Sequence, residues 1–168
     1  MRLNLYLYGI EYELSPIHQG DGVALIPIIA NEETRRFLPQ LCSLFDEING
    51  FLILISTFEK YLHDGTGFLL GIRRDYDLLG FIAVMDIPQY SSIFYAMHPK
   101  YRRNGIMKAC VKEVLDYLII NNMCSSIHTY VSPHNTASIS LLSDLGFVFC
   151  EQNIEDENDE QTWIYQTK

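Results

Sequence analysis

The stretch Met97-His98-Pro99-Lys100-Tyr101-Arg102-Arg103-Asn104-Gly105-Ile106-Met107-Lys108 runs from the end of a strand through a basic turn into a helix that starts at a glycine. The first N–H groups of a helix lack partners and, with the helix dipole, attract anions. Glycine lets such a ligand approach the backbone closely. The turn also holds four of the chain's twelve Lys and Arg residues within nine positions. This pattern predicts a site for an anionic ligand; an ordinary basic turn that caps a helix is the alternative.

The composition limits what kind of protein this is. With 168 residues, 48% hydrophobic and 20% charged, the chain is long enough for one domain, 1–168, with a buried core. The longest apolar run, residues 51–55, is too short for a membrane span. No secretory signal pattern opens the chain. We therefore expect a cytoplasmic protein without a membrane partner.

Charge and cysteine usage exclude further classes. The net charge of −9 argues against a nucleic-acid partner, because clustered Lys and Arg bind phosphate backbones. It favours a cationic or small-molecule partner. The cysteines form no C-x-x-C pair and have no histidine at zinc-ligand spacing, so we expect reduced, mostly buried thiols and no metal. They are Cys42, Cys110, Cys124 and Cys150.

The first third of the chain is expected to be a strand pair followed by helices. Alternating apolar residues predict strands within residues 3–14, and a helix should lie near Val23–Ile29. Asn31, followed by two glutamates, is typical of a helix start. A longer helix, capped by Ser43, is expected from Leu44 towards Leu62.

The remainder alternates strands with two helices. Strands are expected over Gly67–Arg74, Leu78–Asp86, Ser91–Met97, Ile127–Val131, Phe147–Cys150 and Thr162–Tyr165, and helices over Gly105–Ile120 and His134–Leu145. The acidic stretch Glu155–Glu160 should be the solvated turn of the last hairpin. This order predicts a single mixed α/β or α+β domain.

A second informative segment lies about 30 residues after the basic turn. Val131-Ser132-Pro133-His134-Asn135-Thr136-Ala137-Ser138 ends a strand and caps a helix, which stops at Leu145-Gly146-Phe147. Taken alone, this segment demands no function.

Together and in this order, the two segments resemble the GNAT superfamily of N-acetyltransferases. Arg102-x-x-Gly105 follows that family's acetyl-CoA pyrophosphate signature, R/Q-x-x-G-x-G/A, and Asn135-x-x-Ser138 with Leu145-Gly146-Phe147 matches its later N-x-x-S/A…G-F element. The stretch Asn31–Pro39 and the strand Gly80-Phe81-Ile82-Ala83 look like the branch of ribosomal-protein N-terminal acetyltransferases. The resemblance implies the GNAT fold, a mostly antiparallel twisted sheet flanked by helices.

The resemblance also implies a reaction and its site. The family moves an acetyl group from acetyl-CoA, its co-substrate, to a primary amine by direct attack through a tetrahedral intermediate. The backbone near Met97 would bind the pantetheine arm and polarise the thioester carbonyl. Asn135 would bind pantetheine or position the thioester, unless it only caps its helix. Ser138 would donate a proton near the sulfur, unless it is only a small helical residue. The pyrophosphate would be held by the N–H groups across Arg102, Arg103, Asn104, Gly105, Ile106, Met107 and Lys108.

Two residues depart from the family pattern. Met107 stands at the second Gly/Ala of the signature, which implies a less closely approached helix start. Leu142 stands where many members carry a tyrosine that protonates the leaving thiolate; the ribosomal-protein branch commonly lacks it too.

The general base is the residue that the sequence identifies least well. An aliphatic ammonium of pKa ~10 is only about one-thousandth neutral near pH 7, so a proton acceptor would help. The strand glutamate often used by the family is absent from residues 91–95. Asp86 is the first candidate, and a water chain to solvent is the alternative.

Two functions from different classes stay open. The first is an acetyl-CoA-dependent amine N-acetyltransferase, with a small-molecule amine or a protein N-terminus as acceptor, most simply a cationic one because the chain is acidic. The second is a catalytically inactive acyl-CoA-binding module of the same fold. A homodimer is compatible with either.

Overall fold

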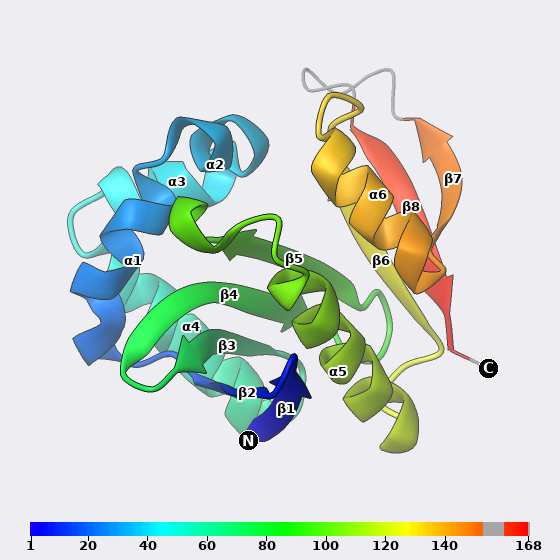
Figure 1. The fold of residues 1–168 in the computed structure, drawn as a ribbon, viewed down its shortest axis with the longest axis horizontal. Helices are drawn as coiled ribbons and strands as arrows, with labels where there is room; N and C mark the ends of the chain where they lie inside the picture. The colour runs from blue at the N-terminus through cyan, green and yellow to red at the C-terminus, as the bar shows by residue number, and fades with distance from the viewer. Residues whose placement is uncertain (153–159, 168) are drawn as a thin grey trace.

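The computed structural model describes residues 1–152 and 160–167, which form one sheet with helices on both faces (Figure 1). The sheet order is β1-β2-β3-β4-β5-β6-β8-β7. Its strands are β1 (Leu3–Leu7), β2 (Ile10–Pro16), β3 (Phe68–Arg74), β4 (Asp77–Met85), β5 (Ser92–Met97), β6 (Ser126–Val131), β7 (Val148–Gln152) and β8 (Gln161–Gln166). All neighbours pair antiparallel except β5 and β6, which are parallel.

Six α-helices cover the sheet. They are α1 (Gly22–Ile29), α2 (Glu32–Phe37), α3 (Pro39–Asp46), α4 (Gly50–Asp64), α5 (Ile106–Ile120) and α6 (Thr136–Leu145), with short 3₁₀ turns at Gln19–Asp21 and Pro99–Tyr101 among the described residues. Figure 1 shows α5 in front of the strands and α4 behind them. The predicted mixed α+β class is confirmed.

Strand alternation divides the core into two layers. In β3, Leu70 and Ile72 face α5, whereas Leu69, directly before Leu70, faces α1 and α4. Successive side chains of a strand point to opposite faces, and both faces here are apolar. The front layer also buries the apolar side of α5, while α1, α3 and α4 cover the back.

The prediction of one long helix from Leu44 towards Leu62 is wrong. The chain instead forms α3 and α4, and Ser43 lies inside α3 rather than capping a helix. Asn49 adopts a left-handed φ of 65° and reverses the chain. A Cβ on Gly50 would lie 1.7 Å from the Leu44 carbonyl oxygen, so only glycine allows this close approach.

The parallel pair β5–β6 positions the site. Its ladder holds only the pair Ser92 and His128, where the His128 N–H donates to the Ser91 carbonyl oxygen at 2.7 Å. Beyond Ser92 the two strands diverge, whereas β5 stays paired with β4 along its whole length. A sheet that opens in this way leaves backbone groups on the inner edge of β5 without strand partners.

Two other expectations concern the remaining segments. Residues 155–159 of the acidic turn, which include Glu155, Asp156, Glu157 and Asp159, lie outside the described residues, so the turn stays a prediction. Among the described helices, none is individually long and apolar enough to cross a membrane. Only α3 and α4 taken together reach that length and composition, and they are bent by 119°.

Candidate active site

A cavity of about 410 Å³ opens where β5 and β6 diverge. Its wall comes from α2, the end of β5, the turn into α5, the end of β6 and the start of α6. It includes all ten residues predicted for cofactor binding: Met97, Arg102, Arg103, Asn104, Gly105, Ile106, Met107, Lys108, Asn135 and Ser138. Two segments about 30 residues apart in the sequence therefore meet at one cavity.

The turn into α5 has the backbone shape of an anion site. Arg103 and Gly105 both adopt left-handed φ angles, 61° and 73°, and Gly105 is the N-cap of α5. A Cβ on Gly105 would meet nothing nearer than the Tyr8 hydroxyl at 4.0 Å, so the space beside it is open. Turns of this kind direct successive N–H groups into one concavity, which suits a phosphate.

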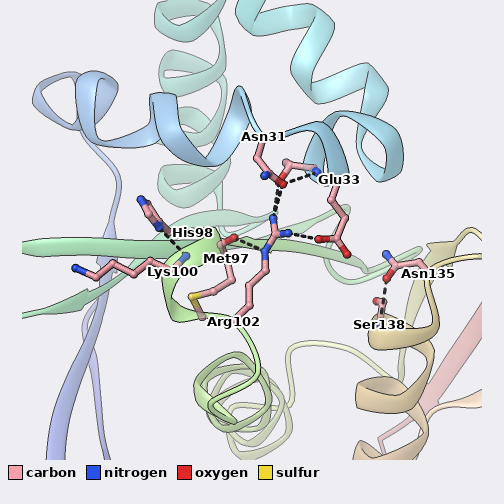
Figure 2. A network of polar contacts seen from close by, with 9 residues as sticks. Asn31, Glu33, Met97, His98, Lys100, Arg102, Asn135 and Ser138 are labelled. Atoms are coloured by element: carbon pink, nitrogen blue, oxygen red, sulfur yellow. Dashed lines mark hydrogen bonds and ion pairs between the residues drawn. The ribbon is translucent and has the colours of Figure 1, made fainter.

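The side chain of Arg102 is turned away from the turn and held by α2 (Figure 2). Its Nη2 donates to Asn31 Oδ1 at 2.9 Å and to Thr34 Oγ1 at 3.0 Å. Its Nη1 pairs with the Glu33 carboxylate, and its Nε donates to the Met97 carbonyl oxygen at 3.0 Å. Four of the five N–H donors of this guanidinium are therefore engaged by protein groups, and the side chain forms a structural contact between α2 and the end of β5.

The other cations of the turn are placed differently. Arg103 is exposed, lines the cavity and has no ion-pair or hydrogen-bond partner within the described part of the chain. Lys108 pairs with Asp144 at 2.8 Å, which joins α5 to α6. Lys100 lies outside the cavity wall, over the Tyr101 ring. Arg103 is consequently the cation best placed to meet an anion at this turn.

The two departures from the family pattern have structural explanations. Met107 is only 9% exposed and packs in the front core layer, so its side chain does not block the opening of the anion site. Leu142 lies one turn after Ser138 on α6 and is completely buried. It brings no hydroxyl to the cavity.

The end of β5 presents backbone groups to the cavity. The His98 N–H donates to the Leu79 carbonyl oxygen of β4 at 2.7 Å. Because backbone groups alternate in direction along an antiparallel strand, those of Met97 and Tyr95 face the gap towards β6. The Met97 carbonyl oxygen already accepts a hydrogen bond from Arg102, whereas the Met97 N–H points towards the gap and can donate to a ligand.

Asn135 and Ser138 lie at the start of α6, across the gap from β5. Asn135 Oδ1 accepts from the Ser138 N–H at 3.1 Å and so caps the helix, as predicted. This bond fixes the amide orientation and leaves the Asn135 NH₂ group available. The Ser138 hydroxyl lies 2.7 Å from the Tyr95 hydroxyl, and burial raises the pKa of Tyr95 to about 12.

Asp86 does not reach this site. It is exposed in the β4–β5 turn, at the opposite end of β5 from Met97, and is absent from the cavity wall. The geometry therefore gives no support to Asp86 as a base. Glu33 is the one carboxylate in the described cavity wall, and Arg102 pairs with it.

Sequence reasoning missed Tyr95, Glu33 and Thr34. Tyr95 could have been found, because it precedes Met97 by two positions and a strand places such residues on one face. The contacts of Glu33 and Thr34 with Arg102 join residues about 70 positions apart, for which the local pattern holds no signal.

No metal site accompanies the cavity among residues 1–152 and 160–167: no three His, Cys, Asp or Glu side chains there cluster as ligands. The four cysteines are free, and none lies in the cavity wall. Cys42 and Cys110 are buried as predicted, whereas Cys150 is exposed on β7.

Known structures share this fold. RimJ from Mycobacterium smegmatis, solved in complex with CoA-disulfide, superimposes with a TM-score of 0.84 at 15% identity, over 98% of this chain and 86% of that one. Spermidine N-acetyltransferase from Vibrio cholerae, in complex with CoA and spermine, gives 0.75 at 17% identity, over 93% and 95%.

Sequence comparison identifies the family. The chain is 27% identical over 139 residues to YoaA of Bacillus subtilis (strain 168), described as an uncharacterized N-acetyltransferase, which covers 80% of this chain and 77% of that protein. The model of the acetyltransferase (GNAT) family matches residues 31–147, which include both predicted motifs. The chain therefore belongs to the GNAT family of acetyltransferases, as the sequence resemblance predicts.

Proposed function

We propose that this enzyme transfers the acetyl group of acetyl-CoA to a primary amine by direct attack through a tetrahedral intermediate. The observation that carries the proposal is the divergence of β5 from β6 directly above an open, glycine-started helix. It creates a long slot with an anion site at its mouth and unpaired strand groups within. CoA has the matching order of pyrophosphate, amide-containing arm and thioester.

The chain offers a complementary group for each part of this co-substrate. The N–H groups of the turn after Arg102 and the free side chain of Arg103 would hold the pyrophosphate. The Met97 N–H would bind the arm and polarise the thioester carbonyl, which becomes an oxyanion on attack. The Asn135 NH₂ group would donate to the arm from the other side of the gap.

The chemical step then requires two proton movements. The amine nitrogen attacks the thioester carbon and loses a proton, the carbon–sulfur bond breaks, and the sulfur gains a proton. Ser138 is the hydroxyl placed to donate to the sulfur. Glu33, the only carboxylate of the described cavity wall, is paired with Arg102. Water in the open cavity is therefore the proposed acceptor of the amine proton.

The acceptor is proposed to be cationic, on the ground of the net charge of −9. The cavity wall adds apolar surface from Phe37, Leu38 and Phe94 beside the end of β5. A fold relative is described as an acetyltransferase of ribosomal L7/L12, and another as one of spermidine. The test panel should therefore include peptide N-termini, polyamines and neutral amines.

Two experiments test the proposal. Release of free thiol from acetyl-CoA with that panel should identify an accepted amine, and its kcat/KM should fall as salt rises from about 0.02 M to about 0.3 M if the acceptor is cationic. A best acceptor that is neutral, with no salt dependence, contradicts the charge assignment. Gly105→Glu should abolish CoA binding in calorimetry, because it places a carboxylate where phosphate lies. Gly65→Glu is the matched control, since Gly65 has φ 72° and open space around it.

An inactive acyl-CoA-binding module is the second candidate, favoured by the buried Leu142 and the occupied Glu33. CoA binding that is sensitive to Gly105→Glu, without thiol release for any amine, would establish it.

A further inference from the structure

Tyr95 reaches across the gap between β5 and α6. Its hydroxyl oxygen lies 2.7 Å from Ser138 Oγ, although the two residues are 43 positions apart. Both residues line the cavity, and Tyr95 is half-buried and packs against the front core layer. No other polar contact directly joins a side chain of β5 to a side chain of α6 in the described residues.

The surroundings of the pair favour one direction of this hydrogen bond. Ser138 Oγ is the only partner that the described residues offer to the Tyr95 hydroxyl. Either hydroxyl can donate at this distance; with Tyr95 as the donor, its half-buried O–H has an acceptor and the Ser138 proton is left to turn to the open cavity. Burial raises the pKa of Tyr95 to about 12, which keeps this phenol protonated throughout the neutral range.

We infer that Tyr95 is a positioning residue that orients the Ser138 hydroxyl as hydrogen-bond and proton donor to the sulfur of CoA. This inference rests on the proposed function. One turn after Ser138, α6 carries the buried Leu142 instead of a hydroxyl, so a group outside this stretch of the helix has to orient the Ser138 hydroxyl. The bond from β5 does this across the gap.

Every proton and electron pair in the proposed step is accounted for. The carbon–nitrogen bond forms, and the electron pair of the carbon–sulfur bond goes to sulfur. Sulfur takes the Ser138 proton, and Ser138 regains one from cavity water, which has accepted the proton lost by the amine. Tyr95 keeps its own proton and only holds the serine oxygen.

The first test is a double-mutant cycle on turnover. Tyr95→Phe and Ser138→Ala should each lower kcat about tenfold with the KM for acetyl-CoA changed less than about twofold, because the lost interaction acts mainly in the transition state. The double variant should be no slower than Ser138→Ala alone, since Tyr95 acts through Ser138. Additive losses, or an unchanged kcat for Tyr95→Phe, overturn the inference. Tyr117→Phe removes a hydroxyl from α5, outside the cavity wall, and should leave kcat unchanged.

The second test needs no turnover and separates this inference from the proposed function. Ultraviolet absorbance of the thiolate measures the pKa of the thiol in bound CoA. An oriented Ser138 donor stabilises the thiolate, so that pKa should be about one pH unit higher in Tyr95→Phe and in Ser138→Ala than in the parent. Equal values in all three proteins overturn the role of Tyr95 even if the enzyme is active. A shift in an enzyme that accepts no amine supports the role while the proposed transfer fails.

Discussion

Arg102 donates its Nη2 hydrogen bond to the oxygen of Asn31 that caps α2. Asn31 Oδ1 accepts from the Thr34 N–H at 3.3 Å and from Arg102 at 2.9 Å. The signature arginine of the basic turn thereby contacts the N-terminus of α2, a helix that contributes to the cavity wall. The side chain of this motif residue therefore joins two elements of the protein, whereas the resemblance assigns the N–H groups of the turn to the ligand.

Removing this arginine should reduce stability more than co-substrate affinity. Arg102→Ala removes four hydrogen-bond partners and should lower the free energy of unfolding by about 2 kcal/mol, the usual size for charged hydrogen bonds. Urea unfolding measures the change. Lys112→Ala, which breaks an exposed pair with Asp116, should cost less than about 0.5 kcal/mol. Equal stability of Arg102→Ala and the parent would show that the α2 contacts are not formed.

Arg103 should carry the charge-dependent part of CoA binding. Arg103→Ala is expected to raise the Kd for CoA about tenfold at low salt, and less at high salt, because it removes an exposed cation from the anion site. Calorimetry at two salt concentrations measures this. Lys100→Ala removes another exposed cation of the same turn, from outside the cavity wall, and serves as the control. A larger effect from Lys100 than from Arg103 would misplace the pyrophosphate.

The contact between α3 and α4 should depend on Gly50. Gly50→Ala places a Cβ 1.7 Å from the Leu44 carbonyl oxygen and is expected to cost at least about 3 kcal/mol, or to prevent folding. Thermal unfolding and soluble yield report the effect. Gly20→Ala meets nothing within 4 Å and should change stability by less than about 1 kcal/mol. A stable Gly50→Ala protein would contradict the observed reversal of the chain.

Acid should weaken the contact between β3 and the Gln19–Asp21 turn. Desolvation raises the pKa of Asp21, but the hydrogen bonds from Arg73 and from the His18 N–H outweigh it, so the pKa lies below its ordinary value. A lowered folded pKa gives stability that is complete above the unfolded value of ~3.9 and is lost as pH falls through the folded value. Unfolding free energies measured between about pH 6 and pH 3 should therefore fall further for the parent than for Asp21→Asn. Parallel curves would mean that this carboxylate contributes nothing to the acid response.

Sequence patterns were sufficient for the parts of the fold that local rules control. The helix expected over Gly105–Ile120 is observed as Ile106–Ile120, because its apolar face and its glycine cap are local features. The division between α3 and α4 depends on the fit of Gly50 against Leu44, which no periodicity encodes.

The candidate site shows the same limit. The two motifs met at one cavity, as the resemblance implies, because each motif lies at the end of a strand next to the gap. The orientation of Arg102 and the contact of Tyr95 with Ser138 are set by residues 43 to 71 positions away. Such contacts arise only when the sheet brings the segments together.

Because β5 and β6 share a single ladder pair, the sheet consists of two parts, β1–β5 and β6–β8, that are only weakly joined by backbone hydrogen bonds. An extended molecule lying in the gap with its own amides would act as a substitute strand and complete the interrupted hydrogen-bond ladder. The bound co-substrate would then stabilise the fold by linking the two parts of the sheet, in addition to its role as a reactant. Amide hydrogen exchange along the inner edges of both parts would slow upon its binding, far beyond the atoms that react.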